Sequence, residues 1–368
     1  MARHKNKQAF DVHRTLPNPH RKAIAAAEAP PTRSAGAKRA LWKRLLVWTF
    51  LLLLAFIIFV GTWDAINISR AATKIFGSGN LLGLLSDRGL KSQNDRVNVL
   101  LVGYSVDDPG HPGADLTDSI LLLSMNTRNH TGYMLSIPRD LYLKIPGFGF
   151  GKINEAYKDG GMPLLEQIVQ SDFGTEVDYY ALINYSAVRD TVNALGGINI
   201  NIASPDPRGL YDTNISPVDG GPLKLANGPQ KLDGQTALNL TRARGDAYGS
   251  YGFAQADFDR TQHQRQVLLA IKDKLNWKLV LNPLKNGKIF QAMGKNVKTD
   301  ISLGETRSLF KTFNSIPSSS LQSISLRSIG GKNLLASYGT DSGQSALVPA
   351  SGLENYLQIQ AAVDQLNQ

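Results

Sequence analysis

The chain has 368 residues, 42% of them hydrophobic, which is enough to bury a large core and to form more than one domain. It contains no cysteine, which excludes thiolate catalysis and cysteine-ligated metal sites. The formal net charge is +10, but residues 1–44 hold eleven Lys or Arg and only two acidic residues. The rest of the chain is nearly neutral, which argues against a nucleic-acid-binding surface on the folded part.

The first 63 residues have the pattern of a tail and a membrane anchor. Residues 1–44 are rich in Ala, Pro and Arg and predict a disordered basic tail that contacts anionic lipid headgroups. Residues 45–63, LLVWTFLLLLAFIIFVGTW, carry no charge, and a helix of this length spans about 28 Å, close to the thickness of a bilayer core. We predict a retained transmembrane helix. A cleavable signal peptide is the alternative, and the long preceding tail argues against it.

The basic flank predicts the orientation of this anchor. The positive-inside tendency keeps the tail in the cytoplasm and places everything after Asp64 outside, as in a single-pass protein of the cell membrane. An extracytoplasmic domain of this size without cysteine fits a bacterial envelope. Residues 64–95 are predicted to be a polar connector to the folded part.

Three continuous apolar runs follow the connector. Because they do not alternate with polar residues, they predict strands covered on both faces, at residues 97–104, 119–125 and 132–137. Helical periodicity predicts helices at 162–171 and 185–195, and Gly196 with Gly197 ends the second of them. A further strand is predicted at 198–201.

The later part of the chain continues this alternation. Asp233 is predicted to cap the helix in "DGQTALNL", and Asp257 to cap a long amphipathic helix. A helix at 302–313 and a strand at 323–328 follow. Alternating strands and helices predict an α/β fold, a three-layer α/β/α sandwich around a mixed sheet. Its main domain is residues 96–275, and residues 276–368, with a Gly/Ser-rich end, are an extension that packs on the same domain.

Charged residues gather beside these apolar elements at three places. The loop of residues 103–118 carries four aspartates. In "SIPRDLYLKIPGFGFGKINEAY", Arg139 and Asp140 directly follow a buried strand, and "TRAR" places Arg242 and Arg244 before the long helix. Ligands of open α/β sheets bind beyond the carboxyl ends of strands. Carboxylates hold Mg²⁺, and arginines neutralise phosphate charge, so the pattern favours phosphoryl transfer over ordinary solvated loop charges.

Four blocks of the sequence occur in the order typical of a known family. "SIPRDLYLKIPGFGFGKINEAYKDGG", "VDYYALINYSAVRDTVNALGGINI", "KLDGQTALNLTRAR" and "DFDRTQHQRQVLLAI" resemble the LytR-CpsA-Psr family of bacterial envelope phosphotransferases, over about residues 95–275. The resemblance implies Mg²⁺-assisted transfer of a glycopolymer from a polyprenyl-pyrophosphate carrier to peptidoglycan. It also implies an apolar pocket in the sandwich that takes the lipid chain.

The resemblance, together with the charge pattern, gives a set of candidate site residues. The expected catalytic group is Arg139, Asp140, Arg242, Arg244 and Asp257, with Asp140 and Asp257 both open as the general base. The expected substrate-binding group is Lys152, Arg260, His263, Gln264 and Arg265. Asp118 is the expected metal ligand, with Asp107 or Asp108 as a second carboxylate.

Three positions depart from the family pattern. Ser105 stands where an aspartate is usual, and Leu116 and His263 replace arginines, with Arg265 expected to compensate for the second replacement. Because these positions concern metal and phosphate contacts, a weakened or altered activity is one expectation. Two other functions therefore stay open. One is a polyprenyl-pyrophosphate hydrolase, in which water replaces the sugar hydroxyl, and the other is a non-catalytic module that binds polyprenyl phosphate or glycan.

Overall fold

The structure, a computed structural model, describes residues 88–106, 115–215, 220–254, 257–275, 292–294 and 296–368, together with residues 66, 69, 70 and 73. All of these belong to one compact unit, Val60–Gln368. The predicted tail at 1–44, the predicted transmembrane helix at 45–63, and Asp107 and Asp108 lie outside the described residues. Within the described part, no helix combines the length and apolar character needed to cross a membrane.

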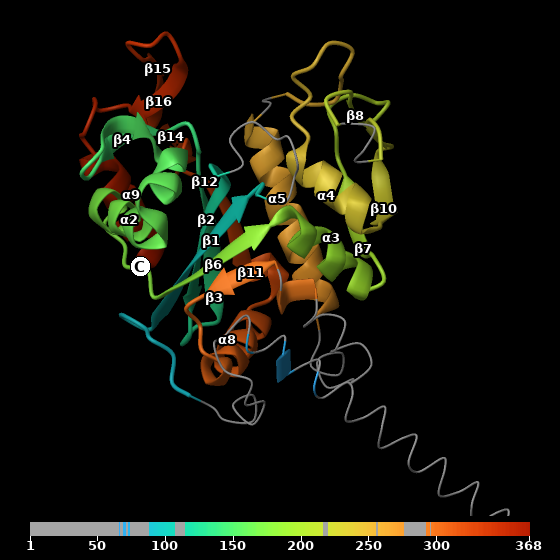
Figure 1. Cartoon of the computed structure of the whole chain (residues 1–368), viewed down its shortest axis with the longest axis horizontal. Coiled ribbons are helices and arrows are strands. Elements are labelled where there is room, and N and C mark those ends of the chain that lie inside the picture. The colour runs from blue at the N-terminus through green and yellow to red at the C-terminus, as the bar shows by residue number, and fades with distance from the viewer. Residues whose placement is uncertain are drawn as a thin grey trace, which may run out of the picture. The chain divides into compact units, whose positions relative to one another are not determined.

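A mixed sheet forms the centre of the fold. Its strands are β1 (Arg96–Tyr104), β2 (Thr117–Asn126), β3 (Thr131–Ile137), β6 (Tyr179–Asn184), β11 (Val297–Thr299), β12 (Leu321–Ser325), β13 (Ser328–Ile329) and β14 (Lys332–Asn333). Their order across the sheet is β11-β6-β1-β2-β3-β12-β13-β14 (Figure 1). β2 is antiparallel to both β1 and β3, whereas β6 runs parallel to β1 and β12 runs parallel to β3.

Helices cover both faces of this sheet because its strands bury alternate residues on opposite sides. The covering helices are α2 (Ala156–Phe173), α9 (Leu357–Asn367), α5 (Asp257–Lys274) and α8 (Leu303–Ser315). Leu100 and Leu122 pack in one apolar cluster with side chains of α2 and α9. Val99 and Leu121 pack in another with side chains of α5 and α8. In Figure 1, α2 and α9 lie together on one side of the strands and α5 lies on the other.

Side-chain caps set the start of several helices. Asn184 begins α3 (Tyr185–Ala194) and Asp233 begins α4 (Gly234–Arg242), each by accepting a backbone N–H three residues on, at 3.0 and 2.8 Å. Ser302 begins α8 with a capping box. Gly196 and Gly197, with φ of 73° and 89°, end the α3 segment in the left-handed region that glycine favours.

A smaller lobe carries α3 and α4 beside the sheet. Its strands are β7 (Ile198–Ile202), β8 (Leu210–Asp212), β9 (Leu223–Leu225) and β10 (Gly228–Leu232), paired as β7 with β10 and β8 with β9. An apolar cluster that includes Ile200 and Leu240 fills this lobe and reaches Val267 of α5. α4 contacts both α3 and α5, and its last turn accepts a hydrogen bond from Gln264 of α5 through the Thr241 carbonyl.

Two hairpins, one directly after β3 in the sequence and one near the end of the chain, are joined by a backbone hydrogen bond. β4 (Tyr142–Ile145) pairs with β5 (Gly149–Lys152), which leads through the 3-10 helix η3 (Ile153–Glu155) into α2. β15 (Leu335–Gly339) pairs with β16 (Ser345–Pro349), and a short 3-10 helix η5 (Ser318–Ser320) precedes β12. The Leu347 N–H donates to the Asp140 carbonyl at 3.0 Å, which joins the second hairpin to the first.

The expected mixed α/β fold with a large mixed sheet is confirmed. The three apolar runs form β1, β2 and β3, and strands from both sides of the predicted boundary at residues 275 and 276 belong to one sheet. The helix predicted at 162–171 is part of the longer α2, which kinks at Gly161, where φ is 69°. The strand predicted at 323–328 is two strands, because the chain turns between Ser325 and Ser328.

Candidate functional site

β1, β3, β6 and β12 all end, and β2 begins, along the same side of the central sheet, here called the strand-end edge. Tyr104, at the end of β1, pairs with Thr117 at the start of β2 and with Asn184 at the end of β6. β3 and β12 end at the same edge, where Ser136 pairs with Ser325. Residues that are far apart in the sequence therefore meet beyond this edge. The prediction that Arg139 and Asp140 lie at a strand's carboxyl end agrees with the end of β3 at Ile137.

Asp118, at the start of β2, lies at the centre of the charged residues on this edge. Its Oδ1 accepts a hydrogen bond from Arg139 Nη1 at 2.7 Å, and its Oδ2 accepts one from the Tyr185 hydroxyl at 2.9 Å. The buried Arg260 donates from Nη2 to the backbone carbonyl of Asp118 at 3.2 Å. Asp118 itself is only 8% exposed, so these contacts are largely shielded from water.

Arg242 joins this group from the smaller lobe. Its guanidinium lies over the ring of Tyr185, with 4.8 Å between Cζ and the ring centroid. Burial, and then the charge of Asp118, raise the pKa of Tyr185, so the phenol stays protonated at neutral pH and can donate. We call Asp118, Arg139, Tyr185, Arg242 and Arg260 the Asp118 cluster.

Helix α5 is placed against the sheet by polar contacts. Ser119 Oγ donates to Gln264 Oε1 at 2.7 Å, and Gln264 Nε2 donates to the Thr241 carbonyl at 3.1 Å. Gln264 lies one turn after Arg260 and shares its face of the helix. Gln264 of α5 thus ties β2, which carries Asp118, to the end of α4, which carries Arg242.

Asp140 and Lys152 extend the cluster towards the β4–β5 hairpin. Lys152 Nζ donates to Asp140 Oδ1 at 3.0 Å, and Arg139 Nε lies 3.8 Å from Asp140 Oδ2. The Asp140 side chain is 32% exposed, against 9% for the Asp118 side chain. Asp140 is therefore the more accessible of the two carboxylates that contact Arg139.

Arg244 lies two residues beyond α4, in a segment held by a buried carboxylate. The backbone N–H groups of Arg244 and Gly245 donate to Asp212 Oδ2 at 2.7 and 2.9 Å. Asp212 is 1% exposed. Because this anchor acts on the backbone, it sets the course of the chain just after Arg242 without engaging the Arg244 guanidinium.

His263 and Arg265 make contacts away from the Asp118 cluster. Arg265 donates from Nη1 to Ser136 Oγ at 2.6 Å and to the Ile324 carbonyl at 3.2 Å, and burial lowers its pKa to about 10. The His263 ring packs edge-on against Phe253, and burial lowers its pKa to about 4. These contacts tie Arg265 to β3 and β12, and His263 to the segment before α5.

The Asp118 cluster combines three guanidinium groups with one carboxylate. Arg139 and Arg260 contact Asp118 directly, and Arg242 contacts it through Tyr185. The excess positive charge favours an anion, and guanidinium groups bind phosphate oxygens in a bidentate manner. The described residues thus place three guanidinium groups around one buried carboxylate, an arrangement that suits an anion such as phosphate.

Comparison with known proteins agrees with this geometry. Residues 73–346, which make up most of the chain and include every residue of the Asp118 cluster, match the LytR_cpsA_psr family. The chain belongs to this family.

Relatives within the LytR_cpsA_psr family have named activities. The polyisoprenyl-teichoic acid–peptidoglycan teichoic acid transferase TagT of Bacillus subtilis (strain 168) is 32% identical over 226 residues. That match covers 61% of this chain and 66% of TagT, so this chain spans just under two thirds of that relative.

Solved structures of LytR_cpsA_psr proteins share the fold. A structure of TagT bound to LI-WTA has a TM-score of 0.56 and 28% identity, and the match covers 76% of this chain and 94% of that one. A structure of TagT with bound octaprenyl pyrophosphate lipid has a TM-score of 0.54 and 27% identity, covering 76% and 93%.

Tyr185 is not among the site residues predicted from the sequence. This residue directly follows β6 and donates to Asp118 from 67 residues further along the chain. The rule that led to Arg139, a polar residue just past a buried strand, also applies to Tyr185 in "YYALINYS". Tyrosine carries no charge at neutral pH, and an aromatic residue after a strand is equally consistent with a place in the hydrophobic core. A search for charged residues therefore does not find Tyr185.

Some predicted site residues are not placed relative to the cluster. Asp107 and Asp108 lie outside the described residues, so the predicted second metal carboxylate stays a prediction. Asp257 is the first residue of α5, and only its backbone is described.

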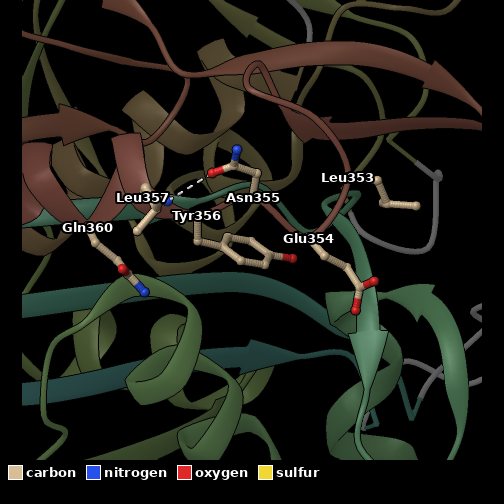
Figure 2. A pocket seen from close by; sticks show the side chains of 6 residues that line it. All are labelled: Leu353, Glu354, Asn355, Tyr356, Leu357 and Gln360. Carbon is tan, nitrogen blue, oxygen red and sulfur yellow. Dashed lines mark hydrogen bonds between the residues drawn. The ribbon is translucent and has the colours of Figure 1, made fainter.

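An open hollow of about 360 Å³ lies elsewhere, at the start of α9 (Figure 2). It is lined by Leu353, Glu354, Asn355, Tyr356, Leu357 and Gln360. Tyr356 packs edge-on against Phe173, at the C-terminal end of α2. The hollow contains none of the predicted site residues, and the apolar pocket expected for a lipid chain stays a prediction.

Proposed function

We propose that this chain is a membrane-anchored, extracytoplasmic transferase that moves a glycopolymer from a polyprenyl-pyrophosphate carrier to peptidoglycan. The observation that carries the proposal is the convergence of Arg139, Arg260 and the Tyr185–Arg242 pair on the buried Asp118. The names of the relatives support it, since TagT is a teichoic acid transferase and one of its structures holds octaprenyl pyrophosphate.

The proposed reaction is one displacement at phosphorus. An acceptor hydroxyl on a muramyl sugar attacks the phosphorus nearer the glycan, and the bond from that phosphorus to the lipid phosphate breaks. The products are a glycan–phosphate–muramyl diester and polyprenyl phosphate. The hydroxyl proton goes to a base, for which Asp140, a partly exposed carboxylate beside the cluster, is one candidate and Asp257 the other.

The arginines serve this reaction by neutralising the diphosphate. Arg139, Arg242 and Arg260 are held in place before substrate binds, by Asp118, by the Tyr185 ring and by the fold, so little reorganisation accompanies binding. We propose that two further residues contact the outer phosphate oxygens. They are Lys152 and Arg244, which lies two residues after Arg242. Such charge-assisted contacts each contribute about 1.5–3 kcal/mol.

Asp118 is also the residue we propose to hold Mg²⁺. Its two oxygens accept one hydrogen bond each, and an ionised carboxylate has about four lone-pair sites, so the capacity to bind a cation remains. Mg²⁺ is commonly held by one or two carboxylates together with substrate phosphates. When bound, the ion would stabilise negative charge on the diphosphate.

The test is release of polyprenyl phosphate from a synthetic lipid-linked sugar by the full-length chain, with and without a peptidoglycan acceptor. Asp118→Asn should abolish release and its response to added Mg²⁺, while binding of the lipid is retained. Asp206→Asn is the matched control, because Asp206 forms an ion pair of the same 2.7 Å length with Arg208 outside the cluster.

Each result of this assay separates one function from the others. Release only with acceptor supports the transferase, and release without acceptor supports a hydrolase. Unmodified protein that binds the lipid but releases no phosphate at any Mg²⁺ concentration would overturn the catalytic proposal in favour of a binding module. Ser105 and Leu116 would then be the residues to restore to the family pattern.

A further inference from the structure

The outer face of the β4–β5 hairpin exposes aromatic and basic side chains. Leu143 and Ile145 face the core and are fully or almost fully buried. Tyr142, Lys144, Phe150 and Lys152 occupy the alternate positions, and the register pairs Tyr142 with Lys152 and Lys144 with Phe150. Since side chains alternate between the two faces of a hairpin, these four residues share the outer face.

The rings on this face are ordered rather than scattered. Tyr142 stacks on Phe150, with ring centroids 5.9 Å apart and an interplanar angle of 22°. It also stacks on Tyr338 of β15, at 5.6 Å and 25°. Phe150 remains 45% exposed although it is a large apolar residue. We call Tyr142, Phe150 and Tyr338 the aromatic strip.

The aromatic strip is continuous with the Asp118 cluster. Tyr142 lies directly opposite Lys152, whose Nζ binds Asp140 at 3.0 Å, and Asp140 in turn faces Arg139. A chain of contacts therefore leads from the rings, through one lysine–aspartate pair, to the site proposed for the phosphates. Figure 1 shows β4 and β15 at the same end of the described fold.

We propose that the aromatic strip binds the sugar rings of the acceptor glycan strand; the proposal rests on the proposed transferase function. An acceptor polymer whose hydroxyl reaches the phosphates must run along the surface next to the site. Flat aromatic rings pack against the C–H faces of sugar rings and leave the hydroxyl edges to water. Ordered, exposed aromatic side chains beside a polar site are typical of a binding surface.

A bilayer is a less suitable occupant of this strip. The residue of this hairpin best placed to contact a membrane is Phe148, which is exposed at the turn. Gly147 and Gly149 on either side of it have φ of 85° and 90°. The strip instead lies along the hairpin towards the charged cluster, and Lys144 and the tyrosine hydroxyls interrupt its apolar surface.

The test measures binding of soluble fragments of alternating N-acetylglucosamine and N-acetylmuramic acid to the full-length chain in detergent, without lipid substrate. Phe150→Leu and Tyr338→Leu keep an apolar side chain but remove the flat ring, and each should weaken binding about tenfold, the scale of ring stacking. Tyr338→Phe keeps the ring and should bind like the unmodified protein. Leu357→Ala is the control and should change nothing, because Leu357 is an exposed apolar residue at the start of α9, outside the aromatic strip.

A second readout is the acceptor concentration dependence of polyprenyl phosphate release. Phe150→Leu should raise the KM for acceptor and leave both kcat and the KM for the lipid substrate unchanged. Unchanged glycan affinity in both leucine variants would overturn the inference. So would a loss of affinity in Phe150→Ser but not in Phe150→Leu, because that result would indicate an apolar contact that does not need the ring. Ring-dependent glycan binding by a chain that releases no lipid phosphate would support the inference while refuting the transferase.

Discussion

Tyr185 connects Arg242 of the smaller lobe to Asp118 of the central sheet. Its hydroxyl donates to Asp118, and its ring supports Arg242. Tyr185→Phe removes the first contact and keeps the second. Because a hydrogen bond to a charged group contributes about 1.5–3 kcal/mol, we expect diphosphate affinity to fall about tenfold or more. Binding by titration checks this, with Tyr248→Phe as the control, since Tyr248 is fully exposed. Equal affinity in both variants would remove Tyr185 from the site.

His263 predicts a pH dependence of stability. Burial lowers its pKa in the folded state to about 4, and the charge of Asp259 opposes this only in part, while an unfolded histidine has a pKa of about 6.5. A depressed pKa gives stability that is complete above about pH 6.5 and is lost as the pH falls towards 4. The shift corresponds to about 3 kcal/mol of unfolding free energy. Melting temperatures between pH 7 and 4 should therefore fall less steeply in His263→Gln than in the unmodified chain. Parallel curves would contradict this.

At the scale of elements, the site depends on how α4 ends. The chain after Arg242 is fixed by Asp212 of β8, which accepts backbone N–H groups from Arg244, Gly245 and Asn214. The smaller lobe thereby controls the position of Arg244 relative to the sheet edge. The lobe is thus part of the site, even though most of the cluster comes from the central sheet and α5.

Asp212→Ala tests this role of the smaller lobe. Buried N–H groups without an acceptor each cost about 1–3 kcal/mol, so we expect the free energy of unfolding to fall by a few kcal/mol and diphosphate binding to weaken. Asp206→Ala is the matched control, because Asp206 also accepts a backbone N–H, from Arg208, but in an exposed segment. Denaturant unfolding and titration measure the two effects. A stability loss without weaker binding would show that Arg244 is not positioned by Asp212.

At the scale of the whole molecule, the proposed function requires the folded unit to lie outside the cell. The charge difference between residues 1–44 and the rest of the chain predicts this orientation. A protease added to intact spheroplasts should degrade the chain beyond Asp64 and spare the tail, as detected with antibodies to each part. Lysed cells, in which both parts are cleaved, are the control. Protection of the C-terminal part would contradict the envelope location.

Features that depend on neighbouring residues could be predicted before the fold was known. Continuous apolar runs predicted β1 to β3 because strands buried on both faces need no alternation. Asp233 predicted the start of α4, since its side chain caps the N–H of Thr236. Arg139 was predicted at a strand end because Pro138 and the loss of apolar residues mark that end locally. The charge pattern pointed to Arg242, and the family resemblance then gave Arg242 and Arg260 their expected roles.

Which of these residues come into contact depends on the packing of the whole fold. Tyr185 reaches Asp118 through the parallel pairing of β6 with β1, and no local pattern specifies that pairing. Arg260 and Arg265 are five residues apart on α5 and point about 140° apart around the helix. Arg265 contacts β3, whereas Arg260 contacts Asp118. The reason is physical: helix phase and strand register are set by packing of the whole core, because a shift of one residue would move every side chain to another face.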